Sequence, residues 1–83
     1  MLKADITVHL KKTVVDPQGL AVKHALESLD YESLKEVRVG KSIAILFDSD
    51  DVEDISKKTD EICKKLLANT VIEDYQFSIK KEV

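Results

Sequence analysis

The chain has little of what would indicate a disulfide scaffold, a redox site or a membrane protein. Cys63 is its one cysteine, so an intramolecular disulfide and a C-x-x-C site are both excluded, and a reducing compartment fits. No apolar run approaches the ~20 residues that span a bilayer, and the first residues lack the apolar core of a secretory signal. We therefore expect a cytoplasmic protein with no membrane segment.

Aromatic residues and positive charge are also scarce. With only two tyrosines, two phenylalanines and no tryptophan, the core must be built from Val, Ile and Leu. Sixteen acidic residues outnumber thirteen basic ones, which argues against a nucleic-acid partner because a phosphate backbone attracts positive charge. A chain of 83 residues makes one domain, 1–83, and self-association would help so small a core to hide apolar area.

Apolar residues at every second position predict four strands. The first covers residues 2–10, and the second covers about 34–40. A turn at 40–42 then leads into a third strand at 43–47, so that the second and third strands form a hairpin. A final strand contains residues 75–79.

Two helices are predicted between these strands. Asp16 suits the N-cap of the first, Pro17 suits its first position, and apolar residues follow at helical spacing up to about Leu29. Asp50 and Glu53 have capping-box spacing for the second helix, for which Asn69 would be the C-terminal cap. The first helix has the apolar stripe Val22, Ala25, Leu26 and Leu29, and the second has Val52, Ile55, Thr59, Ile62, Cys63, Leu66 and Leu67.

The order strand, helix, strand, strand, helix, strand predicts an α+β fold. Its simplest packing is a four-stranded, mainly antiparallel sheet with two helices on one face, the ferredoxin-like split βαβ arrangement. Ala44, Leu46 and Ile72 lie out of phase with the core positions, so part of the other sheet face is apolar too. Because an exposed apolar face usually marks an interface, we expect self-association through the sheet.

Gly19 marks a candidate interface at the start of the first helix. Glycine there costs about 1 kcal/mol relative to alanine, which suggests that something approaches closely. An anion is disfavoured because Asp16 already places negative charge at this helix end and no phosphate-binding glycine motif is present. We therefore favour contact with another protein, although Arg38 and Lys41 fit solvent exposure equally well. The candidate interface residues are Asp16, Gln18, Gly19, Arg38, Gly40 and Lys41.

No motif predicts catalysis or metal binding. His9 and His24 have no orienting partner or nucleophile at a recognisable spacing. The acidic residues at 48–54 lack the glycine and the distal glutamate of a calcium loop, and helix capping explains them more economically.

Four separated segments resemble the PurS family, the small subunit of phosphoribosylformylglycinamidine synthase. They are the D-P-Q-G helix start at 16–19, the H-A-L segment at 24–26, the V-R-V-G-K segment at 37–41, and Asn69 followed by I-E-D-Y at 72–75. This chain has Asp30 where the family often has glycine, and Thr70 where it usually has proline. Asp30 must then adopt the left-handed conformation or end the helix differently.

The resemblance implies an assembly subunit without an active site. In the family, a glutaminase subunit (PurQ) releases ammonia from glutamine, and a synthetase subunit (PurL) uses ATP and magnesium to convert formylglycinamide ribonucleotide to the amidine in purine synthesis. A PurS homodimer bridges them, helps to keep the ammonia path closed and binds no cofactor itself. Both a dimer and a tetramer fit this sequence. The alternative is a small-molecule-binding regulatory module of ferredoxin-like shape, similar to ACT domains.

Overall fold

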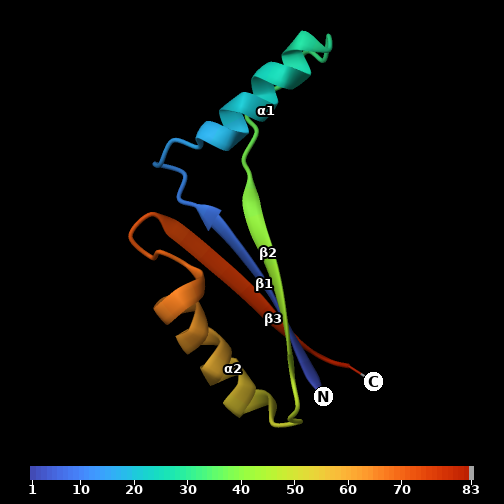
Figure 1. Cartoon of the computed structure of the whole chain (residues 1–83), viewed down its shortest axis with the longest axis vertical. Helices are drawn as coiled ribbons and strands as arrows, with labels where there is room; N and C mark the ends of the chain where they lie inside the picture. The colour runs from blue at the N-terminus through green and yellow to red at the C-terminus, as the bar shows by residue number, and fades with distance from the viewer. Residues whose placement is uncertain (83) are drawn as a thin grey trace.

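Three antiparallel strands form the body of the protein in a computed structural model that describes residues 1–82 (Figure 1). They are β1 (Leu2–Leu10), β2 (Gly40–Phe47) and β3 (Glu73–Lys81), and β1 lies in the middle, paired with both neighbours. Ile6 lies opposite Ile43 on one side and Phe77 on the other. The strands predicted at 2–10, 43–47 and 75–79 are therefore confirmed.

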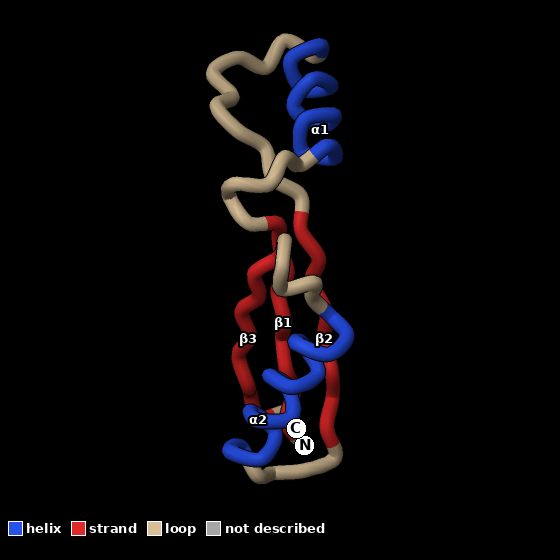
Figure 2. The backbone as a smooth tube through the Cα atoms, turned by 90° about the vertical axis from the view of Figure 1, so that its left-hand side faces the viewer, coloured by secondary structure: helices blue, strands red, loops and turns tan. Residues whose placement is uncertain are grey.

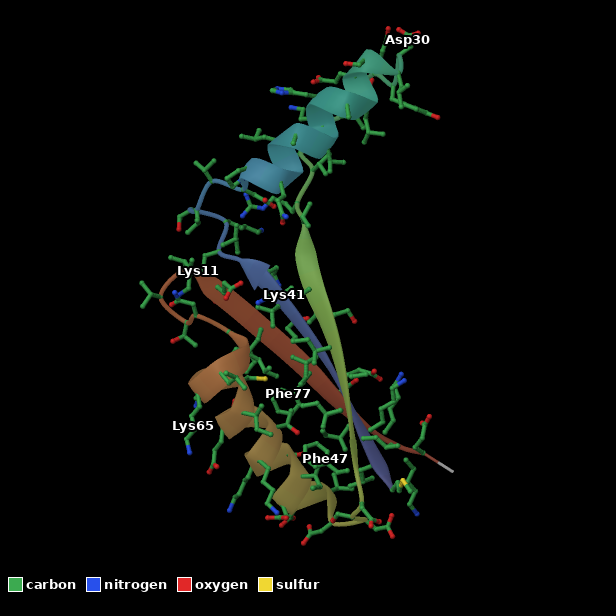
Figure 3. All side chains as sticks on the ribbon, viewed as in Figure 1. Lys11, Asp30, Lys41, Phe47, Lys65 and Phe77 are labelled. Atoms are coloured by element: carbon green, nitrogen blue, oxygen red, sulfur yellow. The ribbon has the colours of Figure 1, made fainter. Side chains whose placement is uncertain are left out.

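The alternation in β1 places its apolar side chains in the core. Leu2 is 1% exposed, and Ala4, Ile6 and Val8 are fully buried. Apolar side chains of β2 and β3 pack against this row but keep part of their surface exposed; Figure 3 shows Phe47 and Phe77 among them, between the sheet and α2. The core is thus centred on β1 and is less complete over the outer strands.

The helix α2 (Val52–Ile62) lies over this face of the sheet (Figure 2). Its N-cap is Asp51, whose side chain accepts a hydrogen bond from the Asp54 backbone N–H at 3.1 Å. The predicted capping box of Asp50 and Glu53 is therefore wrong by one residue. Asp50 instead accepts from the amino group of Met1 at 3.0 Å.

A π-helical turn, η1 (Cys63–Leu67), continues α2 and changes which residues face the core. The Ala68 N–H donates to the Cys63 carbonyl at 2.9 Å, a five-residue step that puts both side chains on the buried side. Leu66 is turned outward and is 79% exposed, so its predicted burial is wrong. Asn69 does not cap the helix, which ends at Leu67 with Ala68 as its C-cap. The Asn69 side chain accepts from the Val71 N–H in the turn before β3.

The helix α1 (Pro17–Ser28) forms with nearly the predicted bounds but not in the predicted place. It stands beyond the end of the sheet, and residues 31–39 return beside it without regular secondary structure before running straight into β2 (Figures 1 and 2). The predicted strand at 34–40 and the hairpin turn after it are therefore wrong for residues 1–82. The prediction that both helices lie on one face of the sheet is also wrong there. Within that range only α2 covers the sheet.

We call residues 17–39 the arm, because they extend away from the sheet. The molecule measures 49 × 30 × 15 Å and has a radius of gyration of 16.3 Å, whereas a compact domain of this length would have about 12 Å. The apolar stripe of α1 is left open: Val22 is 42% exposed and Leu29 is 67% exposed. At the tip of the arm, Asp30 has φ 69°, so of the two expected alternatives the left-handed conformation is the one adopted.

Candidate functional site: the junction between arm and sheet

The six candidate interface residues all lie where the arm joins the sheet. Asp16, Gln18 and Gly19 are at the start of α1, and the other three are in the returning segment or at the start of β2. A pocket of about 290 Å³ opens on one side of this junction, and a second of about 200 Å³ lies on the β1 side. The structure therefore brings together residues that the sequence separates by more than 20 positions.

The Asp16 carboxylate holds the two parts of the junction together. It is nearly buried and accepts one hydrogen bond from the Gly19 N–H at 3.0 Å and another from the Val39 N–H at 2.7 Å. The bond from Val39, then the bond from Gly19, and the nearby charge of Arg38 lower the pKa of Asp16 below its ordinary value. One helix cap therefore also positions the chain just before β2.

Gly19 is required because the returning segment lies directly against it. A Cβ atom at this position would be 2.1 Å from the Val37 carbonyl oxygen, a backbone atom that no side-chain rotation can move away. The close approach expected at Gly19 is therefore present, but it comes from the same chain. The glycine therefore has an explanation within the chain, and its contact with another protein stays a prediction.

Gly40 allows a second close backbone approach, where β2 begins to pair with β1. A Cβ atom there would be 2.8 Å from the Val8 carbonyl oxygen. The two glycines of the chain thus stand on either side of the Val37–Val39 segment and fix the path by which the arm enters the sheet.

Arg38 and Lys41 are exposed, yet both bind backbone carbonyls of their own chain. Arg38 donates from Nη2 to the Lys11 carbonyl at 2.9 Å, and its Nε lies 3.5 Å from a Glu36 carboxylate oxygen. Lys41 donates to the Leu67 carbonyl at 3.4 Å and lies 3.8 Å from Glu73. Both side chains therefore have a structural role at the junction beyond simple solvent exposure.

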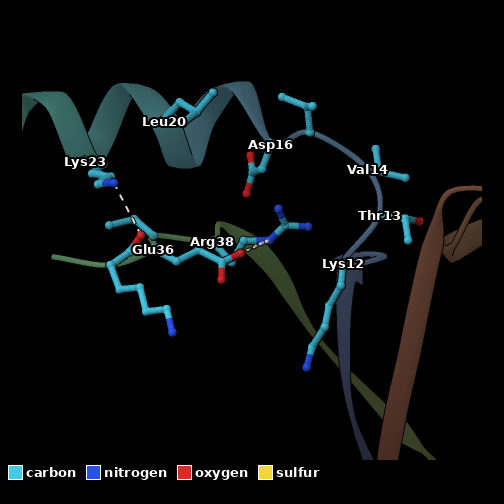
Figure 4. A pocket seen from close by; sticks show the side chains of 11 residues that line it. Lys12, Thr13, Val14, Asp16, Leu20, Lys23, Glu36 and Arg38 are labelled. Atoms are coloured by element: carbon cyan, nitrogen blue, oxygen red, sulfur yellow. Dashed lines mark hydrogen bonds and ion pairs between the residues drawn. The ribbon is translucent and has the colours of Figure 1, made fainter.

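The larger pocket, which we call the junction pocket, combines apolar walls with basic side chains (Figure 4). Val15 and Leu20 contribute apolar surface, since these residues are 69% and 47% exposed. Lys12, Lys23 and Lys35 line it together with Arg38. No sequence motif marks these three lysines, because they are far apart along the chain and only the fold gathers them.

The other candidate groups do not form a catalytic cluster. His9 lies near the end of β1 and lines the second pocket, while His24 is exposed on α1. Cys63 is fully buried, and burial raises the pKa of its thiol. Within residues 1–82 the structure has no group of His, Cys, Asp and Glu side chains suited to a metal ion, and no helix long and apolar enough to cross a membrane.

Comparisons with known proteins agree along nearly the whole chain. The family model PurS, phosphoribosylformylglycinamidine (FGAM) synthase, matches residues 3–81. Subunit PurS of phosphoribosylformylglycinamidine synthase from Bacillus subtilis is 45% identical, over 100% of this chain and 98% of that protein. PurS of Methanocaldococcus jannaschii, a subunit of formylglycinamide ribonucleotide amidotransferase in the purine biosynthetic pathway, superposes with a TM-score of 0.88 at 38% identity over 100% of both chains.

One similar structure comes from a complex. A chain in the structure of PurLQS from Thermotoga maritima superposes with a TM-score of 0.83 at 26% identity, over 96% of this chain and 99% of that one. The likeness therefore includes both the sequence and the extended three-dimensional shape.

Proposed function

Because the chain belongs to the PurS family of FGAM synthase, we propose that it is the small assembly subunit of this ligase and carries no active site of its own. In the complex, the glutaminase subunit PurQ releases ammonia from glutamine. The synthetase subunit PurL uses ATP and magnesium to convert formylglycinamide ribonucleotide to the amidine in purine synthesis. The chain bridges them in the cytoplasm and binds no cofactor itself.

The observation that carries this proposal is the extent of the likeness, since the family model matches residues 3–81 of an 83-residue chain. The expected contribution is physical rather than chemical. Holding two active sites in a fixed relation raises the effective concentration of the ammonia passed between them. The candidate interface residues, Gln18 and Lys41 among them, surround the junction and are proposed to contact a larger subunit.

We further propose that the subunit is a homodimer in which each arm completes the other copy. The strand order β2-β1-β3 is that of a ferredoxin-like sheet without the strand beside β2. Ile43, Ile45 and Phe47 of β2 are only partly buried, which leaves room on the face beside α2. A second copy would supply both missing parts from its arm, with α1 over this face.

The direction of the chain supports an antiparallel exchange. Residues 34–39 continue into β2 without a turn, so two antiparallel copies can each lay this segment along the free edge of the other's β2. The α1 stripe would then cover apolar surface, and each fully buried Val or Leu side chain would contribute about 1.5–3 kcal/mol. In that case the arm of one copy would supply the predicted fourth strand and second covering helix to the sheet of the other copy.

Reconstitution tests the assembly role. Purified PurQ and PurL are mixed with and without this chain, and synthesis of the amidine is measured with glutamine or with ammonium as the nitrogen source. We expect the chain to be required for the glutamine reaction and to matter much less for the ammonium reaction. Equal glutamine-dependent turnover in its absence would refute the proposal.

Sedimentation velocity tests the homodimer. Leu29→Asp places a charge in the α1 stripe and is expected to dissociate the dimer. Leu66→Asp is the matched control, because Leu66 is also exposed but lies on η1, away from the arm. A wild-type monomer, or equal sedimentation of the wild type and the Leu29 variant, would contradict the arrangement.

A further inference from the structure

We propose that the outer edge of β3, which we call the β3 edge, pairs with an extended strand of a larger subunit of the complex. This inference rests on the proposed function and on the proposed homodimer, and it adds a docking surface and a mode of recognition. The strand order β2-β1-β3 gives β3 a neighbour on one side only. In Figure 2, β3 forms one side of the sheet, and α2 lies across the face of the sheet rather than beside this edge.

The β3 edge presents free backbone groups at every second residue. At the two ends of the antiparallel β1–β3 ladder, the Lys11 N–H donates to the Ile72 carbonyl at 2.8 Å, and the Glu82 N–H donates to the Met1 carbonyl at 3.0 Å. Both bonds belong to one alternation, in which residues 74, 76, 78 and 80 bond to β1. The N–H and C=O groups that point to the β3 edge are therefore those of residues 75, 77, 79 and 81.

Residues 75–79 carry none of the features that usually protect a free edge. They contain no charged residue, proline or glycine, and lysines follow only at the end of the strand. Their register with β1 continues without a bulge. A free edge of this kind is a template for pairing with another chain, and proteins normally block it with charge, proline or a bulge. The lack of such protection indicates that the edge is covered in the assembled complex.

The symmetry of the proposed homodimer argues against a second copy at this edge. In that homodimer the arms pair with β2, which is the opposite edge of the sheet. The two β3 edges are then the outer edges of one continuous sheet. Pairing them with further copies would extend the sheet without end, whereas most soluble oligomers are closed. A strand of a different subunit closes the edge instead, by addition of one strand to the sheet.

The side chains of β3 define what the incoming strand presents. Tyr75, Phe77 and Ile79 pack on the α2 side of the sheet and are only partly buried. Gln76 and Ser78 are exposed on the other side. Because neighbouring strands place their side chains in matching rows, the partner strand has apolar residues at every second position and polar residues between them.

Hydrogen exchange tests the pairing directly. The isotope-labelled full chain is exchanged alone and with purified PurL, PurQ or both, and each amide is then read by NMR on the released chain. The amides of Tyr75, Phe77 and Ile79 should exchange rapidly in the free chain and about tenfold or more slowly in the complex, because they gain hydrogen bonds. The amides of Gln76 and Ser78 are the internal control, since they bond to β1 and should be slow in both states.

The outcomes separate this inference from the proposed function. Slow exchange of the Tyr75, Phe77 and Ile79 amides in the free chain would overturn the edge assignment alone. Unchanged exchange of these amides in a complex that does form would also overturn it alone. Failure of the chain to bind either subunit would overturn the proposed function as well.

Substitution distinguishes the β3 edge from the open face of the sheet. Gln76→Lys with Ser78→Lys is expected to weaken binding to the larger subunit about tenfold or more, because lysines oppose pairing at an edge. Thr7→Lys is the matched control, since Thr7 is exposed on the same face but lies opposite Gln76 on the central strand β1, and it should bind as the wild type does. Sedimentation and circular dichroism first check that both variants fold and dimerise. Wild-type affinity of the double variant, or equal weakening by Thr7→Lys, would overturn the proposal.

Discussion

Replacing Gly19 with alanine is expected to destabilise the protein, although the same change inside an ordinary helix would stabilise it. The new Cβ atom would lie 2.1 Å from the Val37 carbonyl oxygen, while ordinary contacts begin at 3.4 Å. The carbonyl must therefore move by about 1.3 Å. A displacement of that size would lengthen the bond from the Val39 N–H to Asp16, now 2.7 Å, beyond hydrogen-bond distance.

The two opposing contributions can be compared. Alanine is better than glycine in a helix by about 0.8–1 kcal/mol. Forcing an extra carbon into a closely packed site costs about 1–3 kcal/mol, and the upper part of that range applies because the atom in the way belongs to the backbone. We expect a net loss of about 1–2 kcal/mol in the free energy of unfolding.

Urea unfolding followed by circular dichroism, at one fixed protein concentration, measures this difference. Gln18→Ala is the matched control, because Gln18 is exposed on the same turn, and its effect should stay within about 0.5 kcal/mol. Hydrogen exchange at the Val39 amide should be faster in the Gly19 variant than in the wild type. A Gly19→Ala protein more stable than the wild type would refute the role assigned to the Val37 contact.

Three further predictions follow from buried or shifted groups. The pKa of Asp16 is lowered, so the stability that its carboxylate contributes is present above the ordinary pKa of 3.8 and is lost as the pH falls through the pKa of the folded protein. Asp16→Asn should therefore reduce the loss of unfolding free energy at acid pH. The same pH dependence in both proteins would contradict this. Cys63 should react with iodoacetamide only as the protein unfolds, whereas rapid labelling of the native protein would show that it is accessible. In urea unfolding, Leu66→Ala should change the free energy of unfolding by about 0.5 kcal/mol or less, because Leu66 is exposed. Ile55→Ala should cost about 2–5 kcal/mol, because Ile55 is buried. Similar losses for the two variants would show that η1 does not turn Leu66 outward.

Most helices and strands were predicted, because residues close together in the sequence determine them. The apolar alternation in β1 predicted which of its side chains are buried, and the Asp16–Pro17 pair predicted where α1 begins. The phase of the second helix was predicted correctly from Ile55 to Cys63, whereas Val52 at its start is 51% exposed. Beyond it, the π-helical turn adds a residue per turn, and no feature of the sequence distinguishes this turn from continued α-helix.

The position of α1 could not be predicted, because periodicity reports which face of a helix is apolar but not which surface covers it. A turn at Gly40 was inferred because glycine often ends a strand, whereas the structure uses Gly40 for close pairing with Val8. The six candidate interface residues all lie at the junction, and their contact with a partner stays a prediction. The lysines of the junction pocket were missed because only the fold brings them together.

The chain folds as a three-stranded sheet with a projecting arm, and we propose that a second copy completes it as a ferredoxin-like unit. The arm is not a loose extension: a nearly buried carboxylate, two glycines and an arginine fix its direction relative to the sheet. An arm whose direction is already set would lose less conformational entropy on binding than a free segment would, so more of the area that it buries would contribute to affinity. The contacts at the junction hold the arm clear of its own sheet, which is the arrangement that the proposed homodimer requires.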